Sequence, residues 1–332
     1  GAGGAAALEA FIAGVETECR VARLLGPSHY AKGWHTTATA GTFGAAAAAC
    51  RLMGLEGDSA ARAFGLAGTQ AAGLKSGFGT MAKPLHAGKA AQNGLFAARL
   101  AARGFTADSD ILDSTQGFAD TQSAAPDAAA VLAERAQPWV VEALFKYHAA
   151  CYLTHDSIEA ALALRREQRV SPEDVAAVTV KVPPGHLGVC AIPEPATGLQ
   201  CKFSLRMTTA LALAGEDTSD ERLFTDATAR RADLVALRDK VTLDPTQSGR
   251  GCVVETTLKD GRTLSRTGDV SQPLRDLELQ QQKLERKFHN LAGPILGAAR
   301  AERVVAFCRA FEAQPEVGAL IALCAGAPPL TA

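Results

Sequence analysis

Four short stretches of this sequence carry histidine, lysine or arginine among glycine, proline and other small residues, where a side chain can approach a ligand. In the first, Gly33–Thr37 (GWHTT), His35 directly precedes an apolar segment of helical character. The N-terminus of a helix attracts a carboxylate through its free N–H groups and its dipole. A histidine beside it can exchange a proton near neutral pH. A half-buried structural histidine next to a helix-capping threonine is the alternative interpretation.

The second stretch, Met81–Gly88 (MAKPLHAG), follows a glycine-rich run. Pro84 is typical of the first turn of a helix, where its missing N–H costs no hydrogen bond. This places Lys83 at the entrance of the predicted helix, where its ammonium group can hold an anion. His86 lies three residues further on, and it either shares that site or fills a core position.

The third and fourth stretches contain further cationic side chains. The third stretch, Phe145–Cys151 with the residues up to His155, contains Lys146, His155 and one more histidine among apolar and small residues. This pattern fits a functional site and a structural role equally well. In Lys202–Met207, Arg206 can clamp a carboxylate with two N–H donors. A surface salt bridge is the alternative for this arginine.

Together the four stretches offer cations and histidines but no recognisable nucleophile. The sequence contains no GxSxG motif, no Walker phosphate loop and no GxGxxG motif after a strand. It also lacks HExxH and clustered Cys/His spacings, so we expect no metal, and its eight scattered cysteines fit reduced thiols in a core. Cations beside histidine suit a small carboxylic acid substrate and proton transfer at the carbon next to its carboxylate.

The composition excludes several classes of protein. Lysine and arginine (34) nearly balance aspartate and glutamate (35), so no excess of positive charge indicates nucleic acid or an anionic membrane as a partner. Hydrophobic residues make up 47% and charged residues 21% of the 332 positions, as in an ordinary folded protein. The most apolar stretch, Ala38–Cys50, is shorter than the roughly 20 residues of a membrane span. Because no signal peptide opens the sequence, we expect a cytoplasmic protein.

The elements that must position these residues are mainly helices. Alanine is abundant and aromatic residues make up only 5%, which favours closely packed helices because small side chains let backbones approach. Apolar residues at helical spacing predict a helix over 5–25 that stops at Gly26-Pro27. Further helices are predicted over 39–52, 59–69, 87–103, 109–117, 155–166, 203–214, 220–229, 277–288 and 300–311, and strands over 175–182, 241–243, 251–258 and 262–267.

The order of these elements predicts a nested organisation. Residues 1–138 form a helical domain, residues 139–276 form a smaller α+β domain, and residues 277–332 return to helices. A proline-bearing stretch over 126–138 marks the first boundary. The expected fold class is therefore mainly α, a large all-helical domain with an inserted smaller α+β domain. Clefts between domains are common places for small ligands to bind.

Four segments of the sequence resemble the MmgE/PrpD family. They are Gly26–Leu55, Ala72–Thr106, Leu144–Leu162 and Cys201–Leu213, and they contain GWH, KPLHAG and an FK…TH combination. The family includes 2-methylcitrate dehydratase, cis-aconitate decarboxylase and iminodisuccinate epimerase. The resemblance implies a homodimer without metal or cofactor, in which the α+β domain acts as a lid and the active site lies between lid and helical domain.

The resemblance also implies an activity and roles for single residues. The activity is that of a cofactor-independent lyase, a dehydratase or decarboxylase of a small di- or tricarboxylic acid. An epimerase of an amino- or imino-dicarboxylate and a catalytically inactive family member are the alternatives. A histidine or lysine is expected to be the acid or base, with two lysines holding substrate carboxylates. The expected catalytic residues are His35, Lys83 and Lys146, and the expected substrate-binding residues are His86, His155 and Arg206.

The sequence departs from the family pattern in two places. In the family, an upstream segment with an Asp-rich stretch and a histidine completes the pocket. This sequence begins inside the helix that follows, so we expect the N-terminal part of the helical domain to be missing from it. A tyrosine that often follows the FSL stretch is replaced here by Met207, next to Arg206, which fits recognition of a different acid.

Overall fold

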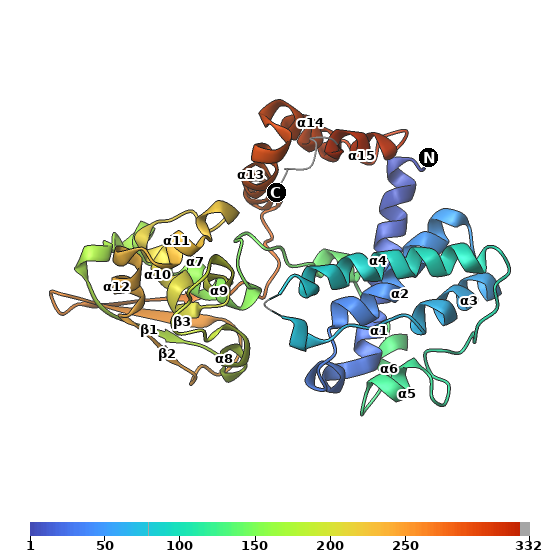
Figure 1. Cartoon of the computed structure of the whole chain (residues 1–332), viewed down its shortest axis with the longest axis horizontal. Helices are drawn as coiled ribbons and strands as arrows, with labels where there is room; N and C mark the ends of the chain where they lie inside the picture. Colours follow the sequence, from blue (N-terminus) through green and yellow to red (C-terminus); the bar gives the residue numbers. More distant parts are fainter. Residues whose placement is uncertain (79, 326–332) are drawn as a thin grey trace. The chain divides into compact units, whose positions relative to one another are not determined.

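The computed structural model describes residues 1–78 and 80–325, which divide into two compact units. Unit 1 takes residues 1–142 and 306–325, and unit 2 takes residues 143–305 (Figure 1). Helices make up most of the described residues, and the four strands found among them form one sheet in unit 2. The fold is therefore mainly α with a small sheet.

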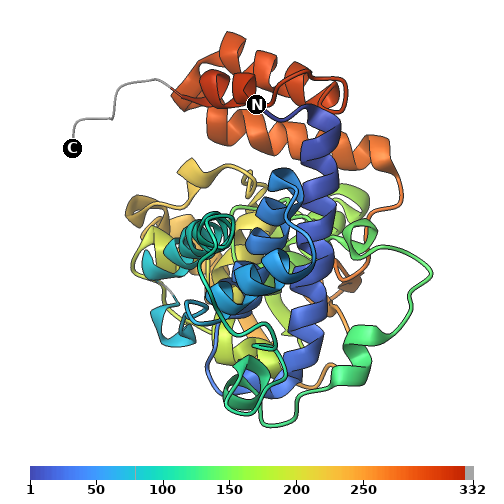
Figure 2. The same ribbon diagram turned by 90° about the vertical axis from the view of Figure 1, so that its right-hand side faces the viewer.

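Unit 1 is built around α1 (Gly4–Ala31), a long helix with α2 (Thr36–Met53) beside it (Figure 2). Helix α2 also contacts the two helices that follow it, so it lies at the centre of the unit. The remaining elements of unit 1 are α3 (Gly57–Gly68), η1 (Lys75–Gly77), α4 (Ala82–Ala101), α5 (Phe118–Gln122), α6 (Ala128–Leu132), η2 (Trp139–Glu142) and α15 (Gly318–Cys324). Helix α14 (Ala298–Arg309) spans the division between the units.

The helices of unit 1 pack closely because small residues line their contacts. Gly94 of α4 lies so near α2 that a Cβ at this position would stand 2.5 Å from the backbone nitrogen of Ala46. The space left by these small residues is filled by Phe43, which is completely buried. Its ring meets Phe64 and Phe118 edge-on at centroid distances of 6.0 and 4.8 Å. The alanine-rich composition is thus used for close backbone approach.

The structure corrects two predicted helix boundaries in unit 1 and removes one predicted helix. Gly26 breaks α1 with a φ of 61°, as predicted, but Pro27 then opens another helical turn that runs to Ala31. Helix α4 begins at Ala82, five residues earlier than predicted. The helix predicted over 109–117 is wrong, because these residues form turns in which Asp108 accepts hydrogen bonds from the backbone of Asp110 and the side chain of Ser114.

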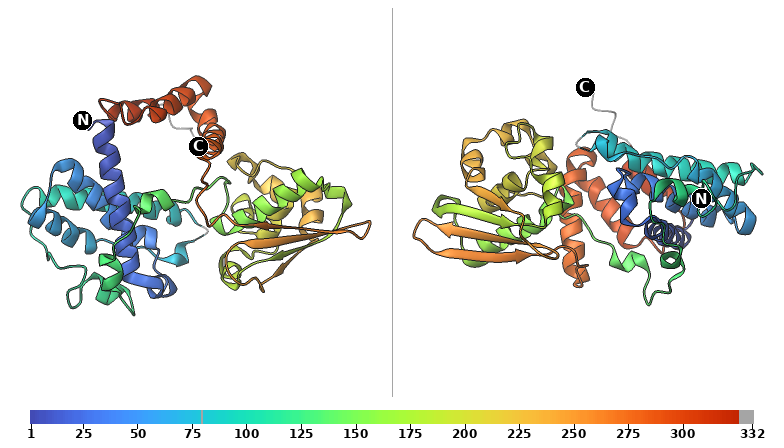
Figure 3. Two further views of the ribbon diagram at one scale, coloured as in Figure 1. Left: turned by 180° about the vertical axis from the view of Figure 1, so that it is seen from behind. Right: turned by 90° about the horizontal axis from the view of Figure 1, so that it is seen from below.

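The sheet of unit 2 has the strand order β2-β1-β3-β4. Strand β1 pairs in parallel with β2 and antiparallel with β3, and β3 and β4 form an antiparallel hairpin. Alternate residues of β3 are buried, which marks one face of the strand as the core side. Helices α7 and α10 contact the sheet and cover this face (Figure 3). The strands are β1 (Val175–Lys181), β2 (Val241–Asp244), β3 (Cys252–Leu258) and β4 (Thr263–Gly268).

Helices α7 and α10 pack against each other, and α10 also contacts α12. The predicted helix over 220–229 is replaced by two short elements, because Asp220 and Thr225 each accept a backbone hydrogen bond that starts a new turn. The helical elements are η3 (Tyr152–Thr154), α7 (His155–Gln168), η4 (Pro172–Asp174), α8 (Pro184–Cys190), α9 (Gly198–Cys201), α10 (Leu205–Ala214), η5 (Glu221–Leu223), α11 (Asp226–Ala229), α12 (Ala232–Arg238) and α13 (Leu277–Leu296).

Candidate functional site

His35 occupies the position immediately before α2, in extended backbone conformation. Its N–H donates to the carbonyl of Gly73 at 2.9 Å, and its own carbonyl accepts from the N–H of Ala38 at 2.8 Å. Position 73 requires glycine, since a Cβ there would stand 2.4 Å from the Cβ of Ala38. Among the described residues no side chain caps the helix, and Thr39 instead contacts Nε2 of buried His29 at 2.8 Å. His35 therefore joins the start of α2 to the glycine-rich segment.

The rings of His35 and His86 meet directly. Their Nδ1 atoms lie 2.9 Å apart, and His86 reaches this position from the first turns of α4. Two such nitrogens form a hydrogen bond only when one carries the hydrogen and the other offers its lone pair. One ring is therefore the donor and the other the acceptor in this contact. Two residues that the sequence places in separate stretches thus share one location.

Phe78 and Lys83 complete this group of side chains. The ring of Phe78 meets His35 edge-on at a centroid distance of 4.8 Å, and Nζ of Lys83 lies 4.3 Å from the centroid of the same ring. Burial, followed by the charges of His86 and Lys83, lowers the pKa of His35 to about 4. His35 is therefore neutral at pH 7 and able to accept a proton. We call His35, Phe78, Lys83 and His86 the unit 1 cluster.

Lys146 lies in unit 2, on an irregular segment that precedes η3. The carbonyl of Lys146 accepts a hydrogen bond from Nζ of Lys287 on α13 at 2.5 Å. Three residues later, the N–H of Ala149 donates to the carbonyl of Thr218 at 2.8 Å. Burial, followed by the charge of Lys146, lowers the pKa of Lys287. The backbone that carries Lys146 is thus held from two sides.

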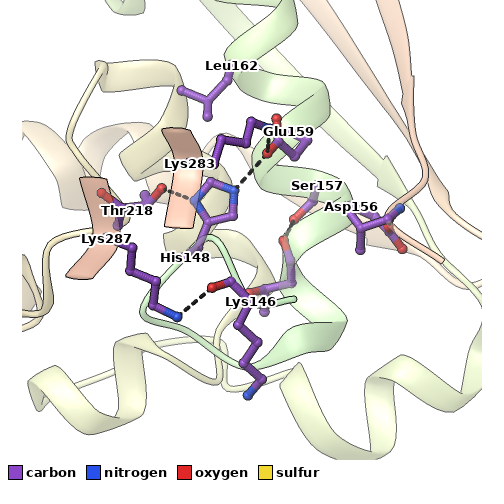
Figure 4. Close-up of polar contacts among 12 residues, drawn as sticks. Lys146, His148, Asp156, Ser157, Glu159, Leu162, Thr218, Lys283 and Lys287 are labelled. Atoms are coloured by element: carbon purple, nitrogen blue, oxygen red, sulfur yellow. Dashed lines mark hydrogen bonds and ion pairs between the residues drawn. The ribbon is translucent and has the colours of Figure 1, made fainter. Parts of the chain in front are cut away.

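A network of hydrogen bonds runs through His148, which belongs to this same segment (Figure 4). The hydroxyl of Thr218 lies 2.8 Å from Nδ1 of His148, and Nε2 of the same ring lies 3.2 Å from Oε1 of Glu159 on α7. Nζ of Lys283 on α13 lies 3.2 Å from the same carboxylate oxygen. Burial raises the pKa of Glu159, but the hydrogen bond from His148 and the charges of His148 and Lys283 outweigh it and lower the pKa to about 2. We call Thr218, His148, Glu159 and Lys283 the His148 network.

His155 packs against the His148 network and is fully covered by protein. Its ring meets His148 edge-on at a centroid distance of 4.9 Å and lies 5.2 Å from the ring of Tyr152. Burial, followed by the charges of His148 and Lys146, lowers the pKa of His155 to about 3. The imidazole is therefore neutral at pH 7, and it contacts other rings rather than solvent.

Arg206 lies elsewhere in unit 2, at the start of α10. Its guanidinium donates to the carbonyls of Val241 and Pro193 at 2.9 and 3.3 Å, and it faces Asp239 at 3.5 Å. All of these partners belong to unit 2, and none of them is a member of the His148 network. The neighbouring Met207 is completely buried in the core of unit 2.

The sequence interpretation did not single out Glu159 or Lys283. Glu159 carries a local signal, because it stands four residues after His155 on the same helix face. Lys283 carries none, since 124 positions separate it from Glu159. Both residues also line a cavity of about 390 Å³ in unit 2, together with Tyr147. Residues 1–78 and 80–325 contain no group of three metal-binding side chains and no helix that is long and apolar enough to cross a membrane.

The geometry defines a mainly helical protein in which histidines and lysines form two groups, each suited to holding an anion or moving a proton. Comparison with known families is more specific. Residues 1–130 match the MmgE/PrpD N-terminal domain, and residues 148–312 match the MmgE/PrpD C-terminal domain. The chain therefore belongs to the MmgE/PrpD family, as its sequence motifs predict.

Two curated relatives extend over nearly the whole chain. The cis-aconitate decarboxylase of Homo sapiens is 26% identical over 339 residues, which cover 97% of this chain and 69% of the relative. The cis-aconitate decarboxylase of Mus musculus is 26% identical over 337 residues, which cover 96% of this chain and 68% of the relative. Family membership and these names support a lyase at the level of the family.

Proposed function

We propose that this protein is a lyase that decarboxylates or dehydrates a small di- or tricarboxylic acid, with its own side chains as acid and base and without a cofactor. Membership of the MmgE/PrpD family supports the reaction class. The names of the two relatives make cis-aconitate the first substrate to test. A homodimer remains part of this proposal, and sedimentation velocity tests it directly.

The observation that carries the proposal is the contact between His35 and His86 with Lys83 close by. His35 is 8% exposed and neutral at pH 7, since its pKa is lowered to about 4. A bound carboxylate brings negative charge, which favours the protonated form of a nearby imidazole. The Lys83 ammonium can hold that carboxylate as a point charge. The unit 1 cluster thus combines an anion-binding group with a pair of rings that can pass one proton between them.

This arrangement suits both candidate reactions. In a decarboxylation the C–C bond to the carboxyl group breaks, CO2 leaves, and the electron pair left on the remaining carbon skeleton takes up a proton. In a dehydration a base removes the proton next to a carboxylate, and an acid protonates the departing hydroxyl group. In both reactions, His35 exchanges a proton with the substrate. His86 then returns His35 to its starting protonation state through the Nδ1 contact.

The roles of three further residues are proposed on the family resemblance and the residue type. Lys146 is proposed to bind a carboxylate of the substrate, and His155 to take part in substrate binding as a neutral ring. Arg206 carries the least weight, because its guanidinium already contacts two carbonyls and Asp239. We therefore expect Arg206 to matter more for the stability of unit 2 than for turnover.

The proposal is tested by incubating the protein in D2O with cis-aconitate, citrate and an amino-dicarboxylate, followed by NMR and mass spectrometry. A decarboxylase releases CO2 and leaves a product one carboxyl group smaller, whereas a dehydratase changes the substrate by one water. An epimerase incorporates deuterium at the α-carbon without any other change in mass. We expect turnover by one of the first two routes, and His35→Gln should lower its kcat about 10²- to 10⁴-fold.

Two results would contradict the proposal. Deuterium exchange without loss of CO2 or water would identify an epimerase, which requires acid and base on opposite faces of one carbon. Neither turnover nor exchange with any of these acids would identify an inactive family member. The assay is run both on this chain and on the gene product from its own start codon, so that a missing upstream segment is distinguished from inactivity.

A further inference from the structure

We propose that Glu159 is a positioning residue, which fixes one tautomer of His148 and thereby holds the segment that carries Lys146. The inference rests on the proposed function only where it assigns a purpose to Lys146. The fixing of the His148 tautomer by Glu159 is a property of the His148 network, and it is tested without any substrate.

The geometry places His148 between two partners of different character. The ring is 6% exposed, and each nitrogen has one partner, Thr218 at Nδ1 and Glu159 at Nε2. Figure 4 shows the ring held between these two side chains, above the chain segment that bears Lys146. The partners come from a loop and from α7, at positions 70 and 11 residues away in the sequence.

The two partners constrain the ring unequally. An ionised carboxylate accepts hydrogen bonds and donates none, whereas a hydroxyl group does both. The hydrogen between Glu159 and His148 must therefore lie on Nε2, whether the ring is neutral or protonated. Thr218 adapts, because its hydroxyl donates to Nδ1 of the neutral ring and accepts from Nδ1 of the protonated one. The carboxylate alone thus decides which nitrogen carries the hydrogen in the neutral ring.

The same carboxylate lies among cations. Lys283 contacts it at 3.2 Å, and Arg166 lies at 4.0 Å from its other oxygen. One helical turn after Lys283 on α13, Lys287 donates to the carbonyl of Lys146. Glu159 therefore offsets the positive charge that Lys283 of α13 places next to His148. Removing its charge takes this counterion from Lys283 and weakens the hold of α13 on the segment.

The segment from Lys146 to Ala149 is consequently attached at three points. Lys287 holds the carbonyl of Lys146, Thr218 holds the N–H of Ala149, and the His148 ring is held by Glu159. Glu159 acts on this segment through His148 and Lys283, and none of these hydrogen bonds joins Glu159 to Lys146. Its role is therefore one of positioning.

The test compares Glu159→Gln with Glu255→Gln in the full chain. The glutamine at 159 keeps the shape of the side chain, but its amide both donates and accepts, so it can satisfy either tautomer. Glu255 is a matched control, because it forms an ion pair with Lys181 at 2.7 Å in the sheet of unit 2 and touches no member of the His148 network. Long-range 1H–15N NMR reports the tautomer of His148, assigned with a His148→Gln variant, and hydrogen exchange reports the protection of residues 145–152.

We expect a single Nε2–H form in the wild type and in Glu255→Gln, and a mixture of tautomers with faster exchange of residues 145–152 in Glu159→Gln. With an active wild type, kcat should fall about 10- to 100-fold in Glu159→Gln, as for other carboxylates that orient a histidine, while KM changes less. An unchanged tautomer and unchanged exchange in Glu159→Gln would overturn the inference. Altered tautomers with unchanged kcat would overturn the positioning role. If the wild type is inactive on every acid, the proposed function is wrong. The NMR and hydrogen-exchange results still show whether Glu159 fixes the tautomer of His148.

Discussion

The Nδ1 atoms of His35 and His86 lie 2.9 Å apart although 51 positions separate the two residues in the sequence. The contact exists because the glycine-rich segment binds the backbone of His35 at Gly73 and then leads into α4, which carries His86. In this contact one ring donates a hydrogen bond and the other accepts it.

Replacing His86 tests this contact. We expect His86→Gln to lower kcat about 10²- to 10⁴-fold, the usual contribution of a positioned acid or base, with a smaller change in KM. Because the two rings act as one unit, His35→Gln/His86→Gln should lose little more than His35→Gln alone. Steady-state kinetics on the substrate found in the panel measure both effects. Losses that simply multiply would show that the rings act independently.

Lys146 is tested by removing its ammonium group. Lys146→Ala should abolish turnover, while the melting temperature stays nearly unchanged, because the hydrogen bond from Lys287 goes to the backbone carbonyl and survives the substitution. Lys89→Ala is the matched control, since Lys89 lies exposed on α4 and contacts Gln92 at 3.0 Å. Intact turnover in Lys146→Ala would remove this residue from the site.

The stability of the protein should fall as the pH drops from 6.5 towards 4. Burial lowers the pKa of His155 to about 3 and that of His35 to about 4, from the ordinary value of 6.5. Below pH 6.5 the unfolded chain binds protons on these rings and the folded protein does not, so acidification favours unfolding. Between pH 7 and pH 5, His155 alone should lower the free energy of unfolding by about 2 kcal/mol.

Urea unfolding between pH 7 and pH 5 measures this dependence. His155→Gln has no titrating ring at this position, so its unfolding free energy should decline less steeply with falling pH than that of the wild type. Each variant is compared with its own value at pH 7, which cancels any direct cost of the substitution. Equal slopes for the two proteins would show that His155 titrates normally in the folded state.

Two glycines of α4 should respond to alanine in opposite directions. A Cβ at Gly94 would stand 2.5 Å from the backbone of α2, whereas nothing lies within 4 Å of a Cβ at Gly88. We expect Gly94→Ala to destabilise the protein by about 1–3 kcal/mol through overpacking. Gly88→Ala should stabilise it by about 0.5–1 kcal/mol, because alanine favours the helix. Urea unfolding of both variants at pH 7 checks the difference, and a neutral Gly94→Ala would mean that α4 can move away from α2.

Particular residues show why some local predictions succeed and others fail. The strands β1 and β3 follow from runs of alternating β-branched residues, and Pro84 lies in the first turn of α4 as expected, although this helix begins five residues before the predicted range. The helix predicted over 109–117 fails because Asp108 binds the backbone of its own neighbours, a competing local structure that apolar spacing does not reveal. The position of Lys83 at a helix entrance is confirmed, whereas its catalytic role stays a prediction.

The sequence by itself determined the family, the mainly helical fold with a small sheet, and the short motifs in which His35, Lys83, Lys146 and His155 stand. These properties depend on spacing over a few residues, which a linear pattern records. Only the tertiary structure decided that His86 faces His35, that Arg206 binds within its own unit, and that Glu159 joins His148 to a lysine 124 positions further along the chain. Such pairs form when packed helices bring distant segments together, and burial then sets the pKa of each ring through neighbours that no local pattern identifies.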